Sequence, residues 1–120
     1  MHVGILQFEL LIRGAESLKD KRRVVRSVKD RLHREHQVSV AEVAHLDRPA
    51  VAGMALTLVN RDARYLQSVL DTIVDKLRKL HDAELGDCTR EVLHGDQLPE
   101  STADDAGRPL WTDAERRDPA

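Results

Sequence analysis

Apolar and polar residues alternate along the first part of the chain, from about residue 2 to residue 13. Alternation with a period of two is typical of a β-strand. One face of this segment is entirely apolar, with Leu6, Phe8, Leu10 and Ile12. The other face mixes apolar and polar residues, so the strand is expected to bury one side and to leave the other partly open.

Two longer segments repeat their apolar residues at three- and four-residue steps, which predicts amphipathic helices near 17–35 and 61–80. Ser17 and Asn60 are the expected N-caps, and Asp62 is expected in the first turn of the second helix. In the first helix, Lys21 falls near the middle of the apolar arc. Because it lies in the first turn, its amino group is expected to extend past the end of the core into solvent.

Three further strands are predicted near 37–46, 50–60 and 83–94. The first two are rich in small and β-branched residues and are joined by a short connection. A bulge is expected near Val40, because two apolar alternations in that segment are out of phase. The last strand has a weak pattern, interrupted by Gly86 and Arg90, which favours an edge position.

The order strand, helix, strand, strand, helix, strand predicts an α+β fold of the ferredoxin-like βαββαβ type. Right-handed crossovers would place both helices on one face of a four-stranded antiparallel sheet, with the first and third strands in the centre. We expect this domain to cover residues 1–94. Residues 95–120 hold three basic and seven acidic residues and few branched apolar ones, so an acidic and mostly disordered tail is expected there.

The net charge of −2 hides an uneven distribution. Residues 19–34 hold eight basic and two acidic residues, a balance of +6 on the predicted first helix. Such a cluster indicates either an anionic partner or a solvated helix face. The candidate RNA-binding residues are Lys19, Lys21, Arg22, Arg23, Arg26, Lys29 and Arg34.

Aromatic residues make up only 2% of the chain, and Phe8 falls on the apolar face of its strand. Stacking of bases on the sheet is therefore disfavoured, whereas phosphate contacts with structured RNA remain open to the basic helix. No DNA partner is expected.

Few residues suggest catalysis, a metal or a cofactor, and none of the three is expected. His33 and His36 are three residues apart on a helix, but no second ligand pair accompanies them. The single Cys88 excludes an intramolecular disulfide and is expected to be a small core residue. Glu9 and Glu42 are expected on neighbouring strands, exposed and solvated. There is no Gly-x-Gly phosphate loop, no membrane-spanning run and no basic leader, so a cytoplasmic protein is expected.

A competing interpretation concerns the open face of the sheet. Six apolar residues are expected to gather there, namely Val3, Ile5, Leu11, Val51, Ala55 and Val59. An apolar patch usually marks an interface, so a homodimer paired through its sheets, with or without a small ligand at the interface, is the alternative to RNA binding. Charge reversal on the first helix would discriminate, because only RNA binding depends on those charges.

Several segments resemble the small bacterial YlxP-like family: Ser17-Leu18-Lys19-Asp20-Lys21-Arg22-Arg23-Val24, the strand segments 3–6 and 38–43, and the strand end at 59–62. The resemblance covers roughly residues 1–94. It implies a ferredoxin-like fold and a role linked to ribosome maturation or translation, with ribosomal RNA or a ribosomal precursor as partner. The chain departs from the family in the short connection at 46–50 and in a less apolar last strand.

Overall fold

Six elements follow one another along residues 1–97, the part of the chain that the computed structural model describes. They are β1 (His2–Leu11), α1 (Leu18–His36), β2 (Ser39–Ala44), β3 (Val51–Asn60), α2 (Ala63–Arg78) and β4 (Glu84–His94), followed by a 3-10 turn at Gly95–Gln97. Their order is the predicted one, and each predicted boundary lies within two residues of the observed one. The expected disordered tail lies, from residue 98 onward, outside the described residues.

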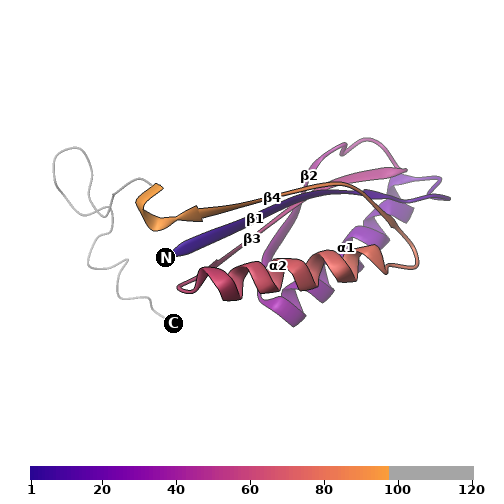
Figure 1. Cartoon of the computed structure of the whole chain (residues 1–120). Coiled ribbons are helices and arrows are strands. Elements are labelled where there is room, and N and C mark those ends of the chain that lie inside the picture. Colours follow the sequence, from indigo (N-terminus) through magenta and orange to yellow (C-terminus); the bar gives the residue numbers. More distant parts are fainter. Residues whose placement is uncertain (98–120) are drawn as a thin grey trace, which may run out of the picture.

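The four strands form one sheet in the order β2-β3-β1-β4, and every neighbouring pair is antiparallel. Both helices cover the same face of this sheet (Figure 1), with α1 packed against β2 and β3, and α2 packed mainly against β1, β3 and β4. The central strands are β1 and β3, as expected from their clean alternation. The α+β ferredoxin-like prediction is confirmed.

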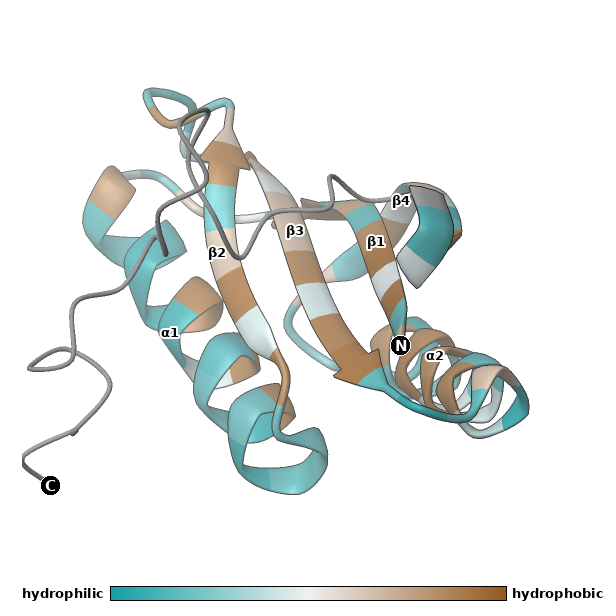
Figure 2. Cartoon of the chain, turned by 90° about the vertical axis from the view of Figure 1, so that its left-hand side faces the viewer, coloured by the Kyte–Doolittle hydropathy of each residue, from teal (hydrophilic) through white to brown (hydrophobic). Residues whose placement is uncertain are grey.

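The hydrophobic core fills the layer between the sheet and the two helices. The predicted face of β1 lies there, and Leu6 and Leu10 are fully buried. α1 and α2 turn their apolar sides toward it, while their outer sides are polar (Figure 2). α1 contributes Val24, Val25, Val28 and Leu32, and α2 contributes Leu66, Leu70, Ile73, Val74 and Leu77. Burial of these side chains is the main force that holds the helices on the sheet.

The bulge predicted near Val40 is wrong in position. Pairing between β2 and β3 shifts between Glu42 and Ala44, so Val43 is the additional residue. A β-carbon on Gly53, which pairs with Ala44, would lie 2.6 Å from the Ala44 Cβ atom. The bulged strand therefore approaches β3 so closely that only glycine fits at this position.

The expected caps are correct for α1 and wrong for α2. The Ser17 hydroxyl accepts a hydrogen bond from the Asp20 amide at 3.2 Å, so Ser17 caps α1. The cap of α2 is Asp62, whose carboxylate accepts from the Arg64 amide at 2.9 Å. Asn60 instead accepts from the Asp62 amide at 2.8 Å. It belongs to the turn that leads β3 into the helix.

The six apolar residues expected on the open face of the sheet share that face, but they do not form one patch. Val3 pairs with Val59 near one end, and Leu11 pairs with Val51 near the other. Between them, the polar side chains of Gln7, Glu9 and Thr57 interrupt the row. Val59 is strongly exposed, whereas Val51 is already buried.

Candidate nucleic-acid interface

The first turn of α1 is built from the segment that begins at Ser17. Its hydroxyl caps the helix, and Asp20 places a carboxylate in the first turn, where the helix dipole favours negative charge. The Asp20 carboxylate also accepts a hydrogen bond from the Glu16 amide at 3.0 Å. These contacts fix where α1 begins.

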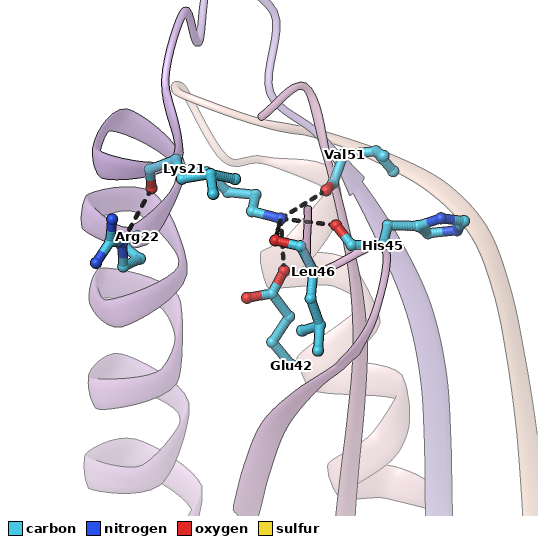
Figure 3. A network of polar contacts seen from close by, with 7 residues as sticks. Lys21, Arg22, Glu42, His45, Leu46 and Val51 are labelled. Carbon is cyan, nitrogen blue, oxygen red and sulfur yellow. Dashed lines mark hydrogen bonds and ion pairs between the residues drawn. The ribbon is translucent and has the colours of Figure 1, made fainter. Parts of the chain in front are cut away.

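Lys21 faces inward and is 1% exposed, which is exceptional for a lysine. Its Nζ atom donates to the backbone oxygens of His45 at 2.8 Å, Leu46 at 3.2 Å and Val51 at 3.3 Å, and it lies 2.8 Å from Glu42 Oε2 (Figure 3). The expectation that this amino group reaches solvent is wrong. The connection between β2 and β3 passes over the helix N-terminus and supplies acceptors there.

Glu42 belongs to the helix-facing side of β2, since it pairs with the core residue Met54. Its carboxylate is the counter-charge of Lys21. Among residues 1–97, Glu42 Oε2 receives no hydrogen bond beyond this ion pair. A buried ammonium group needs such partners, because desolvation without them is costly. Lys21 therefore ties α1 to both ends of the β2–β3 connection.

The residues next to Lys21 face outward. Lys19, Arg22, Arg23 and Arg26 are all exposed, and they line one open hollow on α1 together with Ser27 and Asp30. Arg23 lies 3.4 Å from the Asp20 carboxylate, and Arg22 donates to the Leu18 carbonyl at 3.3 Å. Within the described part of the chain, Lys19, Arg22 and Arg26 form no ion pair with a carboxylate.

The two remaining candidates extend the basic surface toward the C-terminal half of α1. Lys29 is half-exposed and lines a second hollow, between α1 and the first residues of β2. Arg34 is exposed in the last turn. The structure thus brings six of the seven sequence-predicted residues to the surface of one helix, and it places Lys21 in the interior. "Basic surface" below means Lys19, Arg22, Arg23, Arg26, Lys29 and Arg34.

A second polar cluster, which sequence analysis missed, joins the C-terminal ends of the two helices. Glu35 is bonded to Lys76 of α2 and accepts from Arg31 at 3.3 Å. Lys76 also donates to His36 Nε2 at 2.8 Å. Burial lowers the pKa of His36, and the positive charge of Lys76 lowers it further. The hydrogen bond from Lys76 lowers the pKa of the Glu35 carboxyl.

The two helix histidines considered as metal ligands both have protein partners. His33 Nδ1 lies 3.1 Å from the Val38 carbonyl oxygen, and His36 contacts Lys76. Within residues 1–97, no group of three His, Cys, Asp or Glu side chains has the arrangement of a metal site.

The other candidates for chemistry also lie in structural positions. Cys88 packs half-buried against the core, and burial raises the pKa of its thiol. Glu9 and Glu42 are not on neighbouring strands, because β3 separates β1 from β2, and they occupy opposite faces of the sheet. Glu9 instead lies 3.2 Å from His45 Nε2 on the open face.

The model of a family described as "Protein of unknown function (DUF503)" matches residues 3–90. The chain belongs to this family. The match includes the basic surface and the Lys21 anchor of the DUF503 domain, and it ends inside β4. No curated protein matches the chain.

In the part of the chain that the structure describes, neither helix is long and apolar enough to span a bilayer.

Proposed function

We propose that this protein is a non-catalytic RNA-binding factor that contacts RNA phosphates through the outer side of α1. The observation that carries the proposal is the arrangement of Lys19, Arg22 and Arg26. They share one exposed hollow and have no carboxylate partner among residues 1–97. Cations in this state are available for phosphate oxygens, and each phosphate contact releases condensed counterions.

The expected mode of binding is recognition of backbone shape rather than of bases. Phe8 lies on the helix-covered face of the sheet and is 2% exposed, and the exposed ring of Tyr65 belongs to α2. Among residues 1–97, the open face of the sheet thus carries no Phe, Tyr or Trp on which bases of a single strand could stack. Arginines on a rigid helix suit a folded RNA, where phosphates are held at fixed spacing.

The YlxP-like resemblance of the sequence suggests which RNA. It implies a role in maturation of the ribosome, with small-subunit ribosomal RNA or its precursor as ligand, or a role in translation. One of the segments that carry the resemblance, Ser17 to Val24, contributes Lys19, Arg22 and Arg23 to the basic surface. Such a role places the protein in the cytoplasm.

The test is a pull-down of ribosomal subunits and precursor RNA with the full chain. One variant carries Arg22→Glu, Arg23→Glu and Arg26→Glu. A matched control carries Arg61→Glu, Arg64→Glu and Arg78→Glu, three exposed arginines at α2 that make the same change in net charge. We expect the α1 variant to lose RNA and the control to retain it. Equal behaviour of the two at low salt would contradict a role for the basic surface.

A second candidate function is a homodimeric structural or regulatory module that pairs through its sheet, with or without a small ligand. It is favoured by Val59, which is 64% exposed beside Val3 on the open face. Light scattering at micromolar concentration separates the two proposals. A species of about twice 13.6 kDa that persists in the α1 charge-reversal variant would support the dimer.

A further inference from the structure

The outer side of α1 and the last 23 residues of the chain carry opposite charges. The basic surface holds cations without carboxylate partners among residues 1–97, whereas residues 98–120 hold six carboxylates and three arginines. The six are Glu100, Asp104, Asp105, Asp113, Glu115 and Asp118. We infer that the segment 98–120 binds back on the basic surface and competes with RNA for it. The competition presupposes the proposed function, but the contact itself does not.

The position of Gln97 makes this contact geometrically accessible. β4 ends where β1 begins, since His94 pairs with His2. The same end of the sheet receives the C-terminus of α1, because β2 starts there, parallel to β1, after the turn that follows His36. The described chain therefore ends at the same end of the sheet as the last turn of α1, at the β4 edge, whereas α1 packs on β2 and β3.

The length of the segment is also sufficient. α1 has 19 residues and is about 28 Å long at 1.5 Å per residue. The chain from Gln97 to Asp104 can span up to about 25 Å, and the chain from Gln97 to Asp113 up to about 55 Å, at ~3.5 Å per residue. β4 and β2 are three strand spacings apart, about 14 Å, so the contour length to Asp104 is sufficient for Glu100, Asp104 and Asp105 to approach the Lys29 and Arg34 end of the basic surface. The longer contour to Asp113 is sufficient for the hollow around Arg22 and Arg26.

The ion pairs of such a contact would lie at the surface, where water and salt weaken them. Single surface ion pairs contribute little and are screened by salt. Attachment to the same chain raises the local concentration of the carboxylates to about the millimolar range, so several weak pairs compete effectively at low ionic strength. The segment would thus favour RNAs that present many phosphates to the basic surface at once, because only these displace it. RNAs that make few, weak contacts do not displace it.

The contact can be measured without RNA. A nitroxide label is attached to the cysteine of a Ser27→Cys variant, in the hollow of α1. The native cysteine of this full-length chain is removed by Cys88→Ala, so that the label has one site. A matched label at Ser68→Cys on α2 is the control. We expect the label on α1 to broaden amide NMR signals of residues 98–120 at low salt and to lose this effect at about 0.5 M salt, where the Debye length is only a few ångströms. Absence of broadening, or equal broadening from both labels, would overturn the inference.

Competition with RNA is tested with a chain of unchanged length in which the six carboxylates of residues 98–120 are replaced by their amides. The control replaces six exposed acidic residues of the folded part that make no ion pair there: Asp47, Asp75, Asp82, Asp87, Glu91 and Asp96. Affinity for a structured RNA fragment should rise about threefold to tenfold in the first variant only, the size expected when a few surface pairs are removed. An equal rise in both variants would show a general charge effect and would contradict the inference. If neither variant nor the native chain binds RNA while the label contact is present, the proposed function fails and the intramolecular contact stands.

Discussion

Lys21 Nζ lies 2.8 Å from Glu42 Oε2 in the interior of the domain. This pair links the first turn of α1 to the edge strand β2. The backbone carbonyls of His45 and Leu46 in the β2–β3 connection, and of Val51 at the start of β3, complete the shell of the ammonium group. The anchor determines the rotation of α1 about its axis at this turn. With Lys21 inward, Arg22 and Arg23 are directed to solvent, so a buried pair positions the basic surface without belonging to it.

Removing one partner of this pair should destabilise the fold strongly. We expect Glu42→Gln to lower the free energy of unfolding by about 3 kcal/mol, because the ammonium stays buried without its counter-charge. Lys21→Met should cost about 3–5 kcal/mol, since it also leaves the carbonyls of the connection without their donor. Urea denaturation monitored by circular dichroism measures both. As a control, Arg26→Met on the exposed side of the same helix should change stability by less than about 0.5 kcal/mol. Losses below 1 kcal/mol in the first two variants would contradict the anchor.

The close approach of β2 to β3 predicts a steric effect at Gly53. Its substitution Gly53→Ala should cost about 1–3 kcal/mol, because the new β-carbon would lie 2.6 Å from the Ala44 Cβ atom. The double variant with Ala44→Gly should recover part of this loss, since it removes that atom while the Ala44 carbonyl oxygen at 3.1 Å remains. Thermal denaturation of the two variants is the measurement. An additive result, with no recovery, would show that the bulge is not the cause.

The contact between His36 and Lys76 predicts a pH dependence of stability. Because the pKa of His36 is lowered in the folded state, the unfolded chain binds a proton more readily than the folded one. The contribution of His36 to the free energy of unfolding is therefore fully present above the ordinary histidine pKa of about 6.5. It is lost as the pH falls through the lower pKa of His36 in the folded state. His36→Gln should weaken the fall in unfolding free energy between about pH 7 and pH 5. The exposed His81→Gln is the control, and an equal change in both variants would contradict this role of His36.

The salt dependence of RNA binding reports how many phosphates the basic surface neutralises. The logarithm of the affinity should fall linearly with the logarithm of the salt concentration, by roughly 0.7–0.9 for each phosphate contacted. Replacing Arg22 and Arg26 by Gln should reduce the slope by about one for each contact that is lost. Filter binding or fluorescence anisotropy across a range of salt concentrations measures it. A slope unchanged by both substitutions would place the RNA elsewhere on the protein.

The local sequence determined the elements and their order. Alternation in β1 and the three- and four-residue repeats in α1 and α2 predicted these segments within two residues, because burying one face of a strand or helix imposes its own period. Ser17 was predictable as a cap for the same reason, since the cap contact is made within four residues of chain. The charge excess on α1, and hence the candidate interface, also follows from sequence, because residues opposite the apolar arc of a helix face solvent.

What the sequence could not decide depends on contacts between distant segments. Lys21 lies in the apolar arc of α1, and the helical period does not show whether its amino group points to water or inward. The chain from residue 42 to residue 51 passes over the helix N-terminus and supplies the acceptors that hold the amino group inside. The bulge lies at Val43 rather than near Val40, because Gly53 of the next strand leaves room for the close approach of Ala44. Likewise, Glu35 and His36 meet Lys76 only because α1 and α2 end side by side on the same face of the sheet. In each case the partner is 9 to 41 residues away in the chain, and the packing of strands and helices in the fold brings it within reach.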